Sequence, residues 1–164
     1  MYNAQTIIYE DELRRLEEIC ERLLRDSMAR AVFLVDKVGQ LVAEHGQTEN
    51  IDTTSLASLV AGATAATGSL ANLLGEKEFP THYHQGERDS LYIALIGDQW
   101  ILTVIFDERS TEGLVRLRVK RATGELAGVF EEMSARARNE QESHTGLFSE
   151  ITDEDIEDLF SDTF

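Results

Sequence analysis

Apolar side chains recur at two spacings along this chain, and each spacing predicts a different kind of element. Between Tyr9 and Ser27 they lie three and four residues apart, which is the pattern of one buried helix face. The runs AVFLVD (31–36) and QLVAEHG (40–46) are too short and too β-branched for helices and flank a turn at DKVG, so they predict a β-hairpin. Cys20 falls on the apolar side of the helix, and we expect a buried core thiol there rather than a reactive one.

The next segment predicts a long helix without charge. Residues 53–75, TTSLASLVAGATAATGSLANLLG, contain no acidic or basic side chain. Asp52 or Thr53 is placed to cap the first turn, and Gly75 stands where a left-handed C-terminal residue belongs. We therefore expect a helix of about six turns.

The second half of the chain predicts three strands and a closing helix. THYHQG, which follows the only proline, is typical of an edge strand, whereas the next two runs are apolar on both faces and suit central strands. A three-and-four spacing from Val115 to Met133 predicts the helix. The expected ranges are 81–86, 90–97 and 100–107 for the strands and 111–137 for the helix.

The C-terminal end differs in composition from the rest. Residues 139–164 hold nine acids and no Lys or Arg, in a chain whose formal net charge is −16. NEQESHT (139–145) predicts a polar linker, and Thr152 is placed to cap a short amphipathic helix after it. We therefore predict one domain over 1–138 and an acidic tail over 139–164. The apolar residues by which the tail would dock are Phe148, Ile151, Ile156, Leu159 and Phe160.

The charge balance excludes some classes of partner. Nucleic acids and anionic membranes are recognised by clustered Lys and Arg, so the strongly acidic balance of this chain argues against both as partners. A single cysteine allows no intramolecular disulfide and no zinc knuckle, and it fits a reducing compartment. The N-terminal stretch has no signal-peptide pattern, and no apolar run approaches the roughly 20 residues of a bilayer span. We expect a cytoplasmic protein.

Candidate catalytic and metal-binding groups are few. His82 and His84 would share one face of a strand, but the sequence places no third ligand beside them, so we predict polar edge-strand residues and no metal. Asp89 and Ser90 near His84 do not make an activated nucleophile. Neither a phosphate-binding GxxxxGK[ST] nor a GxGxxG after a strand is present. We predict no cofactor and no enzymatic activity of the chain's own.

Two sets of basic residues leave alternatives open. Arg88 and Arg109 lie in connecting segments and are either solvated loop residues or arginine fingers that reach a partner's active site. The only basic cluster is either the solvated side of a core-facing helix or a docking site for acidic groups. It consists of Arg116, Arg118, Lys120 and Arg121.

The uncharged helix has two predicted faces. We expect the bulkier side to pack on the sheet, and it carries Leu56, Leu59, Ala63, Leu70, Leu73 and Leu74. The other side has small uncharged residues, which let another backbone approach closely without desolvating charges. We predict that this side is covered by a partner. Its residues are Ala57, Ala61, Gly62, Thr64, Ala65, Gly68, Ser69 and Asn72.

Several stretches together resemble a known family. The hairpin VFLVDKVGQLV, the motif NIDTTSLASLVAG and the run SLYIALIGDQWILTVIFDERSTEGLVRLRVKRA are similar to Roadblock-type domains, and among them to the MglB proteins that regulate the Ras-like GTPase MglA. The resemblance covers about residues 7–137. The tail FSEITDEDIEDLF also resembles the C-terminal segment of those proteins.

The resemblance implies a fold and a function. The fold is α/β (α+β), with five antiparallel strands, the first and last helices on one face and the long helix on the other. The family forms homodimers that extend the sheet and set the long helices side by side. Such dimers activate a GTP-bound small GTPase by repositioning its own catalytic residues, in bacterial cell polarity and gliding motility. Carried over to this chain, the contact lies at Ala61, Ala65 and Ser69. At position 69 a glycine would be equally natural, so the serine is a small departure from the family pattern.

Other interpretations stay open at this point. A Roadblock domain could hold partners together without changing GTP turnover, and a profilin-like or sensory domain could bind a small molecule on its sheet. The tail could dock on the GTPase, which the resemblance favours, or on the chain's own basic cluster. The resemblance also suggests that partners concentrate the protein at a cell pole.

Overall fold

The structure is a computed structural model that describes residues 6–149 and residue 154. It divides into two compact units, Tyr9–Val129 and a second unit of the N-terminal residues with the chain from Phe130 onward. The elements are α1 (Glu10–Asp26), β1 (Ala31–Asp36), β2 (Leu41–Gly46), α2 (Thr53–Leu73), β3 (Thr81–Gln85), β4 (Ser90–Ile96), β5 (Trp100–Phe106) and α3 (Glu112–Ser149). The predicted order of helices and strands is confirmed.

The five strands form one antiparallel sheet in the order β2-β1-β5-β4-β3. Neighbouring hairpins supply β1–β2, β3–β4 and β4–β5, and the central pairing of β1 with β5 joins the two halves of the chain. In that pairing Phe33 lies opposite Thr103 and Leu34 opposite Leu102. The strand predicted at the edge, β3, is indeed the last strand of the sheet.

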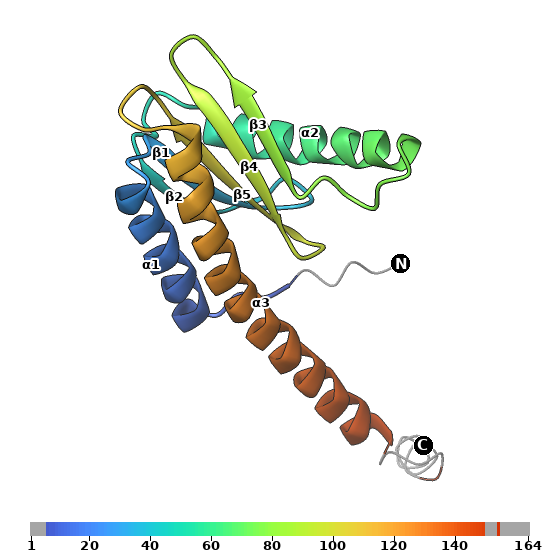
Figure 1. Cartoon of the computed structure of the whole chain (residues 1–164). Helices are drawn as coiled ribbons and strands as arrows, with labels where there is room; N and C mark the ends of the chain where they lie inside the picture. Colours follow the sequence, from blue (N-terminus) through green and yellow to red (C-terminus); the bar gives the residue numbers. More distant parts are fainter. Residues whose placement is uncertain (1–5, 150–153, 155–164) are drawn as a thin grey trace. The chain divides into compact units, whose positions relative to one another are not determined.

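Helices cover both faces of the sheet (Figure 1). One face packs on α2, where Phe33, Val35, Ile93 and Ile101 form a cluster of buried residues with the helix. The opposite face lies under α1 and the first half of α3. There Leu34 and Leu102 are fully buried. Because helices cover both faces, the central strands are apolar on both sides, as their sequence predicts.

The side of α2 that packs on the sheet is not the predicted one. Ala57 and Val60 are buried there, and the bulky Leu59 and Leu73 point to solvent. Small side chains are needed because the helix lies close to the β1–β2 turn: a Cβ on Gly39, whose φ is +91°, would lie 3.1 Å from Ser58 Cα. The large side chains of the interface come from the sheet instead. The prediction that the leucine-bearing side packs on the sheet holds for Leu56, which packs against the buried cluster. It is wrong for the exposed Leu59, Leu70, Leu73 and Leu74.

Both predicted ends of α2 are confirmed, whereas the predicted end of α3 is not. Asp52 accepts a hydrogen bond from the Ser55 backbone N–H at 3.1 Å, and hydrogen bonds from Ser55 lower the pKa of its carboxyl. Gly75 adopts the left-handed conformation with φ +75°. By contrast, α3 continues through residues 139–145, which were predicted to be a linker. The boundary predicted at 138 therefore falls inside a helix.

Candidate partner-binding surface

The solvent side of α2 is an apolar surface that the rest of the described chain leaves uncovered. Leu59 is 72% exposed, Leu70 51% and Leu73 83%. Between them lie exposed small residues, and no charged residue occurs anywhere in the helix. We call this the outer face of α2; it consists of Leu59, Gly62, Ala63, Ala66, Ser69, Leu70 and Leu73.

The structure divides the predicted contact residues into two groups. Gly62, Ala65, Ser69 and Asn72 are exposed, and Gly68 is half-buried. Ala57, Ala61 and Thr64 are buried and lie on the inner side of α2. Their assignment to a partner-binding surface is wrong, because the close packing of helix and sheet requires these small side chains inside. For the exposed residues, partner binding stays a prediction.

The hydroxyl groups on this side of α2 are satisfied by the helix itself. Thr67 Oγ1 donates to the Ala63 carbonyl at 2.8 Å, and Ser69 Oγ donates to the Ala65 carbonyl at 3.3 Å. These hydroxyls therefore need no partner, and the surface behaves as a mainly apolar one. A Cβ added at Gly62 would meet no other atom within 4 Å, so packing within the chain does not require that glycine.

The outer face of α2 groups apolar residues on one side of a helix, unlike the single leucines that are scattered over most protein surfaces. Among the described residues, α2 is the one helix whose length and composition would suffice to cross a membrane. Its buried residues lie against the sheet, as in the core helix of a globular domain. Contiguous apolar surface of this kind in a folded domain marks a contact with another macromolecule.

The two histidines of β3 lie on one face, as predicted, but they are not equivalent. His82 Nε2 lies 3.0 Å from the Phe79 carbonyl oxygen, and burial lowers the pKa of the ring. His84 is exposed. Within residues 6–149 and residue 154, no group of three or more His, Cys, Asp or Glu side chains is arranged to hold a metal. What the geometry shows for His82 is a contact between β3 and the loop before it.

The loop arginines have different surroundings. Arg109 is held by Asp107, whose carboxylate accepts from Nε at 3.0 Å and from Nη2 at 3.0 Å. This bidentate pair lowers the pKa of Asp107 and raises that of Arg109. Arg88 is exposed between β3 and β4. An arginine finger at position 109 would first have to leave its carboxylate.

Cys20 is buried in α1, as predicted. Burial is the main cause that raises the pKa of its thiol to about 12, and the nearby carboxylate of Glu17 adds to the effect. The thiol is therefore protonated at neutral pH and has the character of a core residue.

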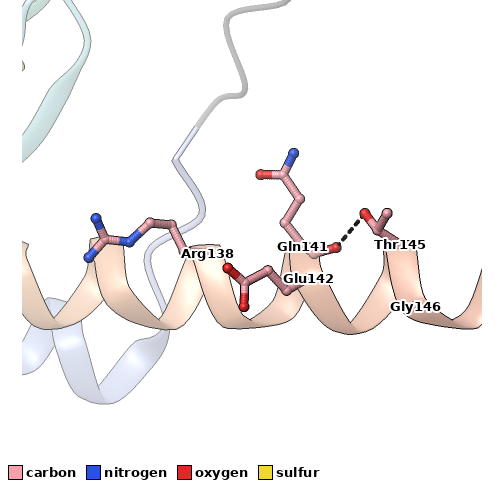
Figure 2. A pocket seen from close by; sticks show the side chains of 5 residues that line it. All are labelled: Arg138, Gln141, Glu142, Thr145 and Gly146. Atoms are coloured by element: carbon pink, nitrogen blue, oxygen red, sulfur yellow. Dashed lines mark hydrogen bonds between the residues drawn. The ribbon is translucent and has the colours of Figure 1, made fainter.

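The C-terminal part of α3 offers a polar surface. Figure 2 shows a hollow lined by side chains of Arg138, Gln141, Glu142 and Thr145, where the Thr145 hydroxyl donates to the Gln141 carbonyl at 2.9 Å. Upstream, Arg136 donates to the Ile7 carbonyl at 2.8 Å. The predicted docking residues Ile151, Ile156, Leu159 and Phe160 lie outside the described residues, as does the side chain of Phe148.

Sequence reasoning missed the leucines of the outer face. Leu59, Leu70 and Leu73 were expected inside because large apolar residues are usually buried. Leu59, Ala63, Ala66, Leu70 and Leu73 recur three and four residues apart, which places them on one face of the helix, but this spacing alone does not tell whether that face is buried or exposed.

Comparison with known proteins identifies the family. Residues 15–106 match the Roadblock/LC7 domain. The structure of Myxococcus xanthus MglB is 54% identical, with TM-score 0.74, over 77% of this chain and 96% of that one. The gliding protein MglB of Thermus thermophilus is 38% identical, with TM-score 0.74, over 78% of this chain and 97% of that one.

A more distant likeness concerns the fold alone. Schizosaccharomyces pombe profilin is 14% identical, with TM-score 0.54, over 70% of this chain and 98% of that one. Among curated protein sequences none matches. The matched domain, the five-stranded sheet between its helices and the high identity to two MglB structures lead to one conclusion: the chain belongs to the Roadblock/LC7 family and, within it, to the MglB proteins.

Proposed function

We propose that this chain is a homodimeric activator of a small Ras-like GTPase of MglA type, with no catalytic residue of its own. The observation that carries the proposal is the exposed, charge-free outer face of α2. Membership of the MglB proteins supports the choice of partner. The relative from Thermus thermophilus is named a gliding protein, which supports a role in bacterial motility. We also propose a cytoplasmic location.

The arrangement of the outer face supports an antiparallel pair of α2 helices. If two copies cross at Ala66 about a two-fold axis, Leu59 of one copy meets Leu73 of the other. Gly62, Ala63 and Ser69 lie near the crossing, where small side chains let the two backbones approach closely. The four leucines at the ends of the crossing then bury most of the apolar area.

The edge of the sheet fits the same dimer. β3 pairs with β4 on one side and is the last strand in the order. A second copy that presents its own β3 would extend the sheet through backbone hydrogen bonds. Helix pairing and strand pairing together would fix the geometry of the dimer.

The GTPase contact is proposed beside the helix crossing. Ala65 and Asn72 are exposed next to the outer face of α2, and Ser69 lies at its margin. Small uncharged side chains at these positions would allow the GTPase to lie close to the α2 pair. Activation would then come from holding the GTPase in the arrangement in which its own catalytic residues engage.

The test is single-turnover GTP hydrolysis by an MglA-type GTPase with and without this chain. We expect faster hydrolysis, and Arg88→Ala and Arg109→Ala should each retain it within about threefold, whereas a finger in trans contributes about 10³ to 10⁵. A loss of that size in either variant would assign the catalytic arginine to this chain. Binding without acceleration would support the scaffold alternative, and absence of binding would overturn the proposal.

A further inference from the structure

Strand β3 carries two histidines on the α2 side of the sheet, next to the open edge. His82 lies opposite Ile93, which belongs to the buried cluster under α2. His84 lies opposite Leu91, which packs against that cluster. Because directly opposite residues of an antiparallel pair share a face, both imidazoles lie on the α2 face. They belong to the last strand of the sheet (Figure 1).

The ring of His82 has one nitrogen with a partner and one without. Nε2 lies 3.0 Å from the Phe79 carbonyl oxygen. A carbonyl only accepts, so Nε2 carries the proton, and Nδ1 of the neutral ring keeps its lone pair. Nδ1 is buried and has no hydrogen-bond partner among the residues that the structure describes. Metal-binding histidines are held in the same way, with one ring N–H on a backbone carbonyl and the other nitrogen left to coordinate.

The backbone of β3 restricts how a second copy of this strand can pair with it. The Leu95 N–H donates to the Pro80 carbonyl at 2.9 Å. At the other end, the Gly86 N–H donates to the Asp89 carbonyl at 3.1 Å. Even-numbered residues of β3 therefore direct their backbone groups toward β4, and odd-numbered ones direct theirs toward the open edge. An antiparallel second β3 must pair odd with odd residues, and so even with even.

A two-fold axis at Tyr83 gives the longest pairing of two β3 strands. In that register every residue of β3 has an opposite residue in the other β3, whereas an axis at position 82 or 84 leaves one end of each strand unpaired. His82 of each copy then lies opposite His84 of the other. These are non-hydrogen-bonded pairs, in which opposite side chains lie closest, with Cα atoms about 4.5 Å apart. The seam between the strands therefore gathers four imidazoles on one face.

We infer that this histidine cluster, His82 and His84 from each of two copies, binds one Zn²⁺ ion at the seam of the dimer. The inference rests on the homodimer proposed above. Imidazole nitrogen is a preferred ligand of Zn²⁺, and four ligands complete its tetrahedral shell. The third and fourth ligands, which the sequence does not place, come from the second copy. Zinc binding and dimer formation are therefore coupled, and each strengthens the other.

Calorimetric titration of the full-length chain with Zn²⁺, after dialysis against a chelator, tests the site. We expect one Zn²⁺ for every two chains. His82→Gln with His84→Gln should weaken binding by about a hundredfold or more, because it removes every ligand.

The other two histidines of the chain, His45 and His144, provide a matched control. His45 lies in β2, at the opposite edge of the sheet, and His144 lies in α3. His45→Gln with His144→Gln removes as many imidazoles and should leave the Zn²⁺ affinity within about twofold. Circular dichroism checks that each variant folds. Equal losses in the two double variants, or one Zn²⁺ for each chain, would overturn the proposal.

Sedimentation equilibrium separates the metal site from the dimer itself. We expect Zn²⁺ to lower the dimer Kd by about tenfold or more in the wild-type chain and in the control variant, but not in His82→Gln with His84→Gln. A dimer whose Kd does not respond to Zn²⁺ would overturn the metal site and leave the proposed dimer standing. A chain that stays monomeric with and without Zn²⁺ would overturn both.

Discussion

Helices α1 and α2 cover opposite faces of one sheet, but their outer surfaces differ. The solvent side of α1 carries charged residues such as Arg14, Glu17 and Glu21, all exposed. The solvent side of α2 carries none and exposes Leu59 and Leu73 instead. Water can solvate these charged side chains of α1. The outer face of α2 has the composition of a surface that a second molecule covers.

The inner surfaces of the two helices differ in the opposite sense. α1 buries the large residues Leu16, Ile19 and Leu23, whereas α2 buries Ala57 and Ala61. The sheet supplies the bulk under α2, and α2 lies close enough to need small side chains. Because the inner side of α2 requires small residues, the large apolar residues of the helix lie on its solvent side.

The largest effect on GTPase stimulation is expected when charge is placed beside the outer face of α2. Ala65→Arg with Ser69→Arg should leave the fold intact, because both positions are exposed, and should reduce GTPase stimulation by about a hundredfold or more. Burying unpaired guanidinium groups at a close contact costs several kcal/mol. The matched control is Glu17→Arg with Glu21→Arg, at the same spacing on α1, which should retain stimulation. Equal rates for the two double variants would break the distinction between the helices.

Removing the leucines should dissociate the proposed dimer. Leu59→Ser with Leu73→Ser deletes four leucines from a two-fold interface, each worth about 1.5–3 kcal/mol when buried, so the dimer Kd should rise about a thousandfold or more. Sedimentation equilibrium measures it. Val38→Ser, another exposed apolar position, should have no effect. A double variant that stays dimeric would place the interface elsewhere.

Enlarging an alanine should affect monomer stability on the inner side of α2 but not on the outer side. Ala57→Leu forces a larger side chain into a closely packed interface and should lower the free energy of unfolding by about 1–3 kcal/mol. Ala66→Leu should change monomer stability by less than about 0.5 kcal/mol and weaken only the helix pairing. Urea denaturation at low protein concentration separates the two effects. If Ala57→Leu costs no more than Ala66→Leu, the assignment of the inner side is wrong.

The smallest effect is expected at a glycine of α3. Gly124→Ala should raise the free energy of unfolding by about 0.5–1 kcal/mol, because its Cβ would meet open space and alanine favours the helix. At Gly39 the same change should destabilise, since φ is +91° and Ser58 Cα lies 3.1 Å from the new Cβ. Thermal unfolding of both variants checks the signs. A destabilising Gly124→Ala would show that something in solution approaches this glycine.

The sequence predicted most helices and strands because the spacing of their apolar residues fits only one kind of element. In α1, charged residues occupy every side but one, so the buried face follows from spacing alone. The strands around Phe33 and Ile101 are too short and apolar to be anything but covered strands. The C-terminal part of α3 was missed because residues 139–145 have no apolar stripe. They are nevertheless helical, with the Ser143 hydroxyl donating to the Asn139 carbonyl at 2.9 Å.

The orientation of α2 shows where sequence reasoning stops. The sequence predicted that the uncharged stretch 53–75 is a helix capped by Asp52 or Thr53, and that it carries no charged side chain that must be solvated. The structure gives Thr53–Leu73, with Asp52 as the cap. The sequence did not determine which side faces the sheet, because a helix without charges has no polar side to exclude from the core. Only the packing of Phe33, Ile93 and Ile101 against α2 decided that Ala57 and Ala61 are inside and Leu59 and Leu73 outside. The physical reason is volume, since a close helix–sheet contact holds a limited amount of side chain and the sheet already supplies most of it.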